Sequence, residues 1–360
     1  MNIDLFLEEY KHVLRSLNTK SLLSVSFDIT RKCNLKCKHC YYKNRNVGVD
    51  YLSSIERAFE VAQKLSELNV MEIVICGGEP LCSDYIVDFL RFLKERDVMI
   101  RLLTNGILID QYIGELSCLF DNNDVLQVSI DEPLKIKVGQ RYSNASQDDS
   151  RVRVFANLEK ACSNLRNVIV NITPTVFNQN YIPNIVEDVA ARGVRNISTT
   201  SYMPIGGINA DVIKPDYHRL KMVNQEVGAL CKKYNIIFYG ELDGHPCQNP
   251  STPAGKRSWV MDDVPYRTCD AAYFSLHLSN DGIFFPCVFF QGEGLEISSI
   301  KYSVHKISND FYKTNPIHMN NLPDKCKRCK FYSNCNGGCM GLIFNRYGTV
   351  GDYVDPRCIH

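Results

Sequence analysis

The sequence predicts an α/β fold with a parallel sheet, followed by a cysteine-rich region of little regular structure. Three observations predict it. From about residue 21 to residue 200, short apolar runs rich in β-branched residues alternate with longer segments of helical period. The chain has 360 residues, more than a single typical core needs. From residue 268 onward Cys, Gly, Asn and aromatic residues replace the periodic pattern, so something other than an apolar core must hold that region together.

Six strands and the helices between them account for the first part of the chain. After the first strand, Ile55, Phe59, Ala62, Leu65 and Leu68 recur at spacings of three and four, which is typical of an amphipathic helix. Repeated strand–helix–strand intervals predict parallel strands. Six strands are too few for a closed eight-stranded barrel, so we expect a partial, TIM-like (β/α)6 barrel with its chemistry at the carboxyl ends of the strands. The candidate strands are residues 23–29, 72–76, 98–103, 125–130, 167–173 and 195–200.

Composition divides the chain into four parts. A helical pattern at residues 217–234 and a strand pattern at 236–239 lead into a loop rich in turn formers, which we interpret as a transition between domains. We expect an N-terminal extension, a barrel, a bridging segment and a cysteine-rich domain, at residues 1–20, 21–210, 211–260 and 261–360 respectively.

Charge and cysteine usage narrow the function classes. The chain has 41 basic and 40 acidic side chains, so its net charge of +1 predicts no general attraction to nucleic acid or to an anionic membrane. No secretory signal and no membrane-spanning apolar run are present, so we expect a soluble, cytoplasmic protein. The chain has 16 cysteines, ten of which fall in two groups near its two ends, and in a reducing compartment such grouping favours metal binding over disulfides.

The first group follows the first strand directly. Cys33, Cys37 and Cys40 place three thiols within eight residues, enough to bind one metal centre and to leave a coordination position open. A structural zinc site normally has four protein ligands, so an incomplete set favours a substrate or cofactor in the gap. A zinc knuckle or reduced structural thiols are the alternatives.

This CxxxCxxC spacing resembles the signature of the radical S-adenosylmethionine (SAM) enzymes. The resemblance implies that the three cysteines hold a 4Fe-4S cluster at the end of the first barrel strand and that SAM binds the open iron. His39 stands where the family usually has an aromatic residue that contacts the adenine.

Segments at the ends of the next three strands also resemble the family's SAM contacts. Ser129 and Asp131 fit a pattern that the family often continues with Gly, where this chain has Glu132, and with Arg twelve residues beyond the Ser, where it has Arg141. Each of these residues has an alternative interpretation. Asn105 could belong to an ordinary turn, Ser129 and Asp131 could cap the next helix, and Arg141 could be an ordinary ion-paired arginine. The resemblance implies SAM contacts at His39, Gly77, Gly78, Glu79, Asn105, Ser129, Asp131 and Arg141.

The C-terminal cysteines resemble a SPASM domain, which holds two auxiliary 4Fe-4S clusters. The resemblance assigns Cys326, Cys329, Cys335 and Cys358 to the outer cluster and Cys269, Cys287 and Cys339 to the inner cluster. The inner cluster is then one ligand short. The missing ligand is Cys247 or a non-cysteine group, or else that iron is open to substrate. A pair of zinc sites is the alternative for the whole region.

By resemblance, the leading function is that of a peptide maturase. The cofactors would be three 4Fe-4S clusters and SAM, whose cleavage yields a 5′-deoxyadenosyl radical that abstracts hydrogen from a peptide and leads to a cross-link. Expected partners are the peptide substrate, an electron donor such as flavodoxin or ferredoxin, and a separate leader-binding protein, because only about 22 residues precede the first strand.

Two other functions stay open. The same chemistry acting on a sugar, an alcohol or a tetrapyrrole is the first, and a noncatalytic iron-sulfur or zinc protein is the second. The sulfatase-maturating branch places Asp after the cysteine matching Cys287, whereas this chain has Val288, so formylglycine formation is not expected. No residue is assigned as a catalytic acid or base.

Overall fold

The chain folds into two compact units. One consists of residues 1–26, 63–72 and 245–360, and the other, the barrel unit, consists of residues 27–62 and 73–244. The four-part division inferred from composition stays a prediction. The computed structural model describes residues 24–42, 54–68, 70–141, 150–203, 210–239, 242, 271, 275–289, 294–296, 323–330, 335 and 337–358.

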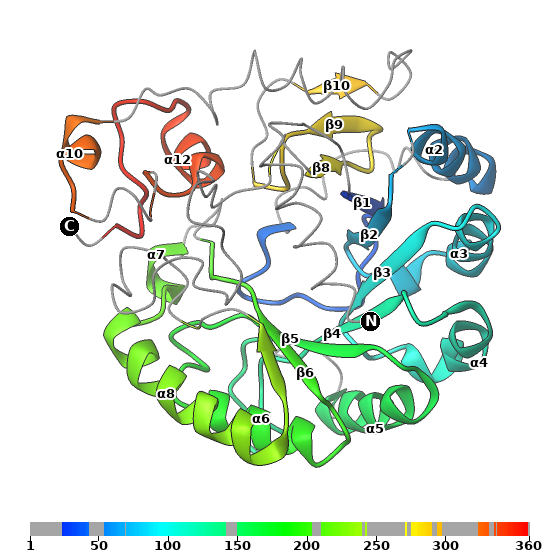
Figure 1. Ribbon diagram of the computed structural model, residues 1–360, viewed down its shortest axis with the longest axis horizontal. Helices are drawn as coiled ribbons and strands as arrows, with labels where there is room; N and C mark the ends of the chain where they lie inside the picture. The colour runs from blue at the N-terminus through cyan, green and yellow to red at the C-terminus, as the bar shows by residue number, and fades with distance from the viewer. Residues whose placement is uncertain are drawn as a thin grey trace, which may run out of the picture. The chain divides into compact units, whose positions relative to one another are not determined.

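Seven strands form the sheet of the barrel unit, and they lie side by side in chain order (Figure 1). From β3 to β7 every neighbouring pair is parallel, and Ser129 at the end of β4 is in register with Asn171 on β5. Because these strands run parallel, their carboxyl ends lie at one edge of the sheet. The strands are β1 (Ser24–Thr30), β2 (Glu72–Gly77), β3 (Met99–Thr104), β4 (Val125–Ser129), β5 (Val168–Ile172), β6 (Asn196–Thr199) and β7 (Ile237–Tyr239).

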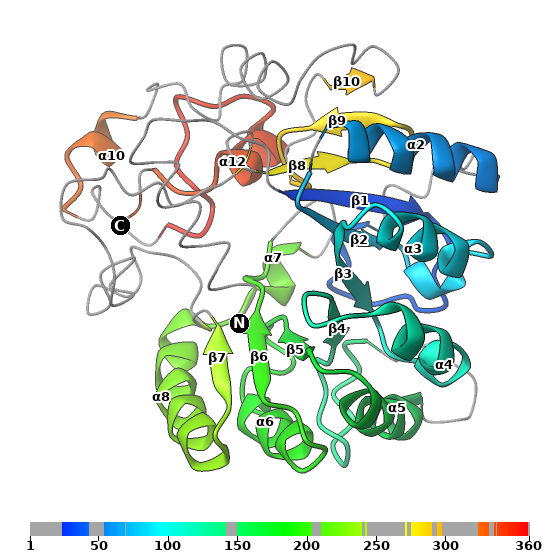
Figure 2. The same ribbon diagram turned by 45° about the vertical axis from the view of Figure 1, so that its right-hand side comes forward.

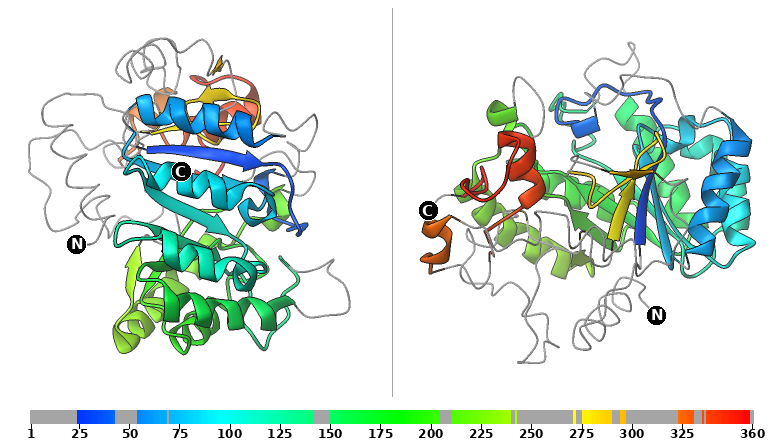
Figure 3. Two further views of the ribbon diagram at one scale, coloured as in Figure 1. Left: turned by 90° about the vertical axis from the view of Figure 1, so that its right-hand side faces the viewer. Right: turned by 90° about the horizontal axis from the view of Figure 1, so that it is seen from above.

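Helices between these strands cover the outer face of the sheet, as α5, α6 and α8 do beside β4 to β7 (Figure 2) and as the cyan and green helices do in side view (Figure 3). Helix α3 shows why: its residues Phe89 and Leu93 are fully buried, and the Phe89 ring lies 5.6 Å from that of Phe27 on β1. The helices are α2 (Ile55–Glu67), α3 (Ile86–Lys94), α4 (Ile109–Leu119), α5 (Ser150–Asn164), α6 (Ile182–Ala190), α7 (Ala210–Ile213) and α8 (Tyr217–Tyr234).

The predicted α/β class and the partial barrel are confirmed, since the sheet is largely parallel and unclosed. Strand β7 departs from the expectation in one respect. The sequence pattern predicts a strand here within the bridging segment, whereas β7 pairs in parallel with β6 and extends the sheet. The strand has only three residues and Ile237 is half exposed, so its sequence lacks the buried apolar run that marks the other strands.

The other unit contains short elements. Strands β8 (Ser275–Leu278), β9 (Ile283–Phe285) and β10 (Leu295–Glu296) pair antiparallel in that order. Helices α10 (Asp324–Lys327) and α12 (Met340–Tyr347) follow. Among the helices described, none is both long and apolar enough to cross a membrane.

Candidate functional site

Two glycines hold the cysteine-bearing loop against the end of β2. The amide of Gly78 donates to the Thr30 carbonyl at 2.8 Å, and the amide of Glu79 donates to the Lys32 carbonyl at 2.8 Å. A Cβ on Gly77 would lie 2.5 Å from the Thr30 oxygen, and one on Gly78 would lie 2.3 Å from the Lys32 oxygen. Only glycine fits at either position, so the sequence pair seats the loop directly before Cys33.

The three thiols lie on one loop and influence one another electrostatically. Burial raises the pKa of Cys37 to about 12; the nearby Arg141 guanidinium acts in the opposite direction, and the Cys40 and Cys33 thiols raise it further. Cys37 is buried, whereas Cys33 is exposed. Three soft sulfur donors grouped on one loop, with one of them open to solvent, fit an iron-sulfur cluster.

Glu79 is fully buried and connects β2 to the turn after β3. Its Oε1 accepts from the Thr104 hydroxyl at 2.6 Å and its Oε2 accepts from the Asn105 amide at 2.7 Å. Burial raises the pKa of Glu79 to about 7, although both of these hydrogen bonds lower it. The structure thus gives Glu79 a supporting contact on each oxygen, and its predicted contact with the SAM ammonium stays a prediction.

Asn105 reaches back to the cysteine loop. Its Nδ2 donates to Asn34 Oδ1 at 2.6 Å, and Asn34 lies between Cys33 and Cys37. Asn157 on α5 holds the same turn, because its Nδ2 donates to the Gly106 carbonyl at 2.9 Å. The turn after β3 is therefore fixed from two sides rather than being an isolated tight turn.

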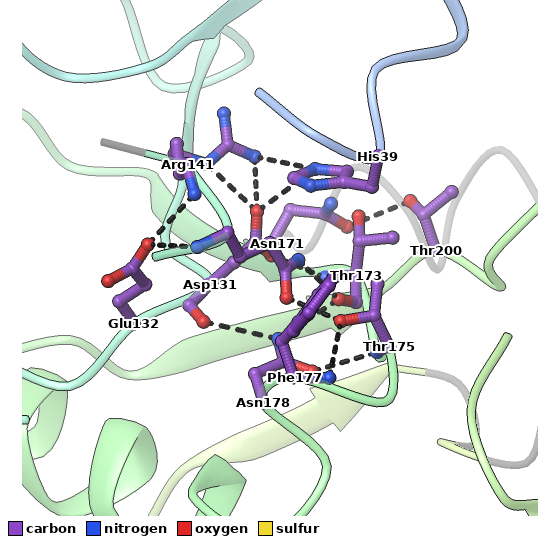
Figure 4. A network of polar contacts seen from close by, with 11 residues as sticks. His39, Asp131, Glu132, Arg141, Asn171, Thr173, Thr175, Phe177, Asn178 and Thr200 are labelled. Carbon is purple, nitrogen blue, oxygen red and sulfur yellow. Dashed lines mark hydrogen bonds and ion pairs between the residues drawn. The ribbon is translucent and has the colours of Figure 1, made fainter. Parts of the chain in front are cut away.

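His39, Asp131 and Arg141 form one polar cluster (Figure 4). Arg141 donates to Asp131 through both Nε and a terminal nitrogen, and His39 Nε2 lies 3.3 Å from the same carboxylate oxygen. The other carboxylate oxygen accepts from the Thr173 amide at 2.7 Å. Burial of Asp131 acts to raise its pKa, but the Arg141 charge and then the His39 contact hold that pKa well below its usual range.

This cluster leaves one polar atom of His39 available. The Nδ1 atom is buried and has no hydrogen-bond partner among the described residues, whereas Nε2 faces Asp131. A buried nitrogen without a partner is costly unless a ligand bonds to it. The residues present therefore fit a polar ligand beside the cysteine loop, as the resemblance to SAM-binding enzymes implies.

Ser129, at the carboxyl end of β4, is half-buried. Its register partner Asn171 belongs to a polar group that the sequence analysis missed. Asn171 Oδ1 accepts from the hydroxyls of Ser198 and Thr200, each at 3.0 Å, which leaves the amide nitrogen to donate elsewhere. Asn171 is a polar residue near the end of the buried run of β5, and that signal in the sequence could have pointed to the group.

Two of the described C-terminal cysteines bind a residue of a buried ion pair through their backbone amides. The carboxylate of Asp355 binds Arg357 through two nitrogens, at 3.0 and 2.8 Å, and accepts from the Cys339 amide at 2.7 Å. The Asp355 carbonyl accepts from the Cys358 amide at 2.8 Å. Asp355 thus fixes the backbone of two predicted ligands that the resemblance assigns to different clusters.

The remaining C-terminal predictions differ in what the structure describes. Cys326 and Cys329 share a turn, since the Cys329 amide donates to the Cys326 carbonyl at 3.0 Å, and Cys335 accepts from Gly338 in the same way. The sulfur of Cys287 lies against the start of α12, 3.3 Å from a Cβ built on Gly341. Cys269 and Cys247 lie outside the described residues. The complete ligand sets therefore stay predictions.

Comparison with known proteins finds one family model and several relatives that match this chain. The model of the Radical SAM superfamily matches residues 27–189. An S-adenosylmethionine-dependent nucleotide dehydratase of Lacinutrix mariniflava is 26% identical over 216 residues, which are 58% of this chain and 44% of the relative. A GTP 3′,8-cyclase of Clostridium perfringens is 28% identical over 185 residues, 49% of this chain and 54% of the relative. The chain thus spans about half the length of the curated relatives it matches.

Solved structures match more of the chain at lower identity. Streptococcus suis SuiB bound to S-adenosylmethionine has a TM-score of 0.74 and 18% identity, over 98% of this chain and 82% of SuiB. The protein anSMEcpe with bound AdoMet has a TM-score of 0.69 and 18% identity, over 93% of this chain and 94% of anSMEcpe. These likenesses establish the fold. The superfamily match identifies residues 27–189 as a radical SAM domain, and the fold of the chain is consistent with that match.

Proposed function

We propose that this protein is a radical SAM enzyme that modifies a peptide, with a cross-link or a similar oxidative change as the product. The observation that carries the proposal is the position of the His39–Asp131–Arg141 cluster at the carboxyl ends of the strands, where His39 itself lies on the loop that carries Cys33, Cys37 and Cys40. When a 4Fe-4S cluster and SAM are bound there, they supply a 5′-deoxyadenosyl radical that removes hydrogen from an unactivated carbon.

The chain's own residues would position the cluster, SAM and the substrate. The three cysteines would hold the cluster, and Gly77 and Gly78 hold their loop. Ser129 and the amide nitrogen of Asn171 offer hydrogen-bond donors at the neighbouring strand ends, which suit the polar atoms of SAM or of the substrate. The Asp131 carboxylate keeps the Arg141 guanidinium in a fixed place, with both groups almost completely buried.

Two observations support a peptide as the substrate. The spacing of the C-terminal cysteines resembles the SPASM extension of peptide- and protein-modifying members of the superfamily. SuiB bound to its precursor peptide SuiA also has this fold, with a TM-score of 0.73. The proposal includes two auxiliary 4Fe-4S clusters, an electron donor such as flavodoxin or ferredoxin, and a separate leader-binding protein.

A small-molecule substrate is the second candidate, and the curated relatives favour it. The Clostridium perfringens relative is named for a cyclisation of GTP, and the Lacinutrix mariniflava relative for dehydration of a nucleotide. Both matches cover only about half of each relative. A nucleotide therefore joins the sugars, alcohols and tetrapyrroles as a small-molecule alternative.

Anaerobic reconstitution tests the chemistry. We expect about twelve iron atoms per chain if three 4Fe-4S clusters form, and release of 5′-deoxyadenosine from SAM in the presence of a reductant. Replacement of Cys33, Cys37 and Cys40 by Ala should abolish that release and remove one cluster. Cys118→Ala is the matched control, because Cys118 is exposed on α4. Stoichiometric zinc without 5′-deoxyadenosine would contradict the proposal.

Mass spectrometry distinguishes the two substrate classes. The protein is co-expressed with candidate short peptides, and a loss of about two hydrogens per cross-link is sought in the peptide. In parallel, purified protein is incubated with SAM, reductant and GTP, and the nucleotide is analysed for a rearranged product. A modified peptide supports the proposal, whereas conversion of GTP alone supports the second candidate.

A further inference from the structure

Glu132 is buried at the start of the loop that follows β4, and its carboxylate accepts hydrogen bonds from four consecutive backbone amides. Oε2 accepts from Val138 and Gly139 at 3.0 and 3.1 Å, and Oε1 accepts from Gln140 and Arg141 at 2.8 Å each. A carboxylate offers about four acceptor positions. All of them are used within the loop, so Glu132 has none left for a substrate or a metal.

The loop organised in this way supports the cysteine loop. Gln140 is fully buried, and its carbonyl accepts from the amide of Lys38 at 2.9 Å. Lys38 lies between Cys37 and Cys40. The Gln140 side chain extends the support to the end of β5, because its Nε2 donates to the Thr173 carbonyl at 3.3 Å.

The same loop delivers Arg141 to the ligand side of the site. The Arg141 amide is held by Glu132, and its guanidinium contacts Asp131 and lies 3.5 Å from His39 Nε2 (Figure 4). Glu132 thus fixes the backbone of Arg141, and the neighbouring Asp131 fixes its side chain. A change at Glu132 therefore reaches Arg141 and the cysteine loop through different atoms.

We propose that Glu132 is a positioning residue, which sets the loop at residues 138–141 so that Arg141 and the cysteine loop are pre-organised for SAM. This inference rests on the proposed function for its ligand. It assigns a role to the residue at which the sequence departs from the family pattern, where Gly is usual. Glycine has no side chain with which to bind the four amides.

Hydrogen exchange and SAM binding test the proposal together. Glu132→Gln keeps the shape of the side chain but replaces one oxygen by a donor, which then faces two amides that also donate. We expect exchange of the amides at residues 138–141 and at Lys38 to accelerate at least about tenfold, and the SAM dissociation constant of the reconstituted protein to rise about tenfold. Iron per chain should stay unchanged, because no predicted ligand is altered.

Glu115→Gln is the matched control, since Glu115 is exposed on α4 and should leave both measurements unchanged. If Glu132→Gln does not fold, Gly139→Ala perturbs the same loop, because Gly139 has a φ of +72° and a Cβ there meets only the end of Lys38, at 3.8 Å. Glu132→Asp should recover part of the SAM affinity.

The outcomes separate this proposal from the proposed function. Faster exchange with an unchanged SAM dissociation constant, or unchanged exchange, would overturn the positioning role. If the unmodified reconstituted protein does not bind SAM at all, the proposed function fails instead, and the exchange measurement still reports whether Glu132 organises the loop.

Discussion

Replacement of Gly78 by Ala tests how closely the cysteine loop is packed against β2. The added Cβ would lie 2.3 Å from the Lys32 carbonyl oxygen and 2.8 Å from that of Arg31. Real Cβ atoms essentially never approach closer than 3.0 Å, so the Lys32 carbonyl must move by about 0.7 Å. Cys33 follows Lys32 directly and has to move with it.

The size of the effect follows from the contacts that this movement breaks. Hydrogen bonds from Gly78 to Thr30 and from Glu79 to Lys32 are both 2.8 Å long, and both reach the limit of a hydrogen bond when the segment from Thr30 to Lys32 moves away as a whole by that distance. Each contributes about 1 kcal/mol, and overpacking adds about 1–3 kcal/mol. The free energy of unfolding should fall by about 3–5 kcal/mol, a large part of a typical total of about 5–15 kcal/mol.

Urea unfolding of the reduced, cluster-free chain measures this change, and iron per chain after reconstitution measures its effect on the predicted cluster. Gly114→Ala is a matched control, because Gly114 lies within helix α4 and a Cβ there meets nothing within 4 Å. That change should raise stability by about 0.5–1 kcal/mol. An unchanged unfolding midpoint together with full iron content in Gly78→Ala would refute the packing argument.

Three further substitutions probe other contacts. The Asp131→Asn variant of the cluster-free chain should lose less stability in acid than the unmodified chain does. The reason is that a carboxyl whose pKa is lowered in the folded state adds stability above its unfolded pKa of about 3.9, and this stability is lost as the pH falls. Urea unfolding midpoints measured between pH 5 and about 3 report the difference. Asp355→Asn breaks a buried ion pair and weakens the anchor of Cys339, so stability should fall by about 3 kcal/mol, with iron lost from the C-terminal sites. Asn157→Ala removes the donor to the Gly106 carbonyl and should cost about 1–2 kcal/mol by urea unfolding.

Each of these has a control or a contrary result. Asp324→Asn is the control for Asp355→Asn, because Asp324 is exposed and pairs only loosely with Lys327, at 3.4 Å. Full iron content in Asp355→Asn would remove the anchoring role. If the urea unfolding midpoint of Asp131→Asn falls with pH as steeply as that of the unmodified chain, the pairing of Asp131 is contradicted. Unchanged stability in Asn157→Ala would mean that the turn after β3 does not depend on the hydrogen bond from Asn157.

Local patterns in the chain determined a good part of the fold and the location of the site. Apolar runs predicted the strands from β1 to β6 to within two residues at each end, because a strand buried on both faces needs such a run. Parallel strands bring their carboxyl ends to one edge, so residues following separate strands, such as Cys33, Gly77 and Asn105, were expected to meet. Spacing alone grouped the cysteines.

Only the tertiary structure decided which polar groups bind one another. Glu79 faces the turn after β3, His39 faces Asp131, and Glu132 holds amides six to nine residues later in the chain. No local pattern encodes these choices, because each partner comes from a different strand end or from an irregular loop. Buried donors and acceptors must be satisfied by whichever groups the fold brings within about 3 Å, so the sequence located the site and the packed chain assigned its contacts.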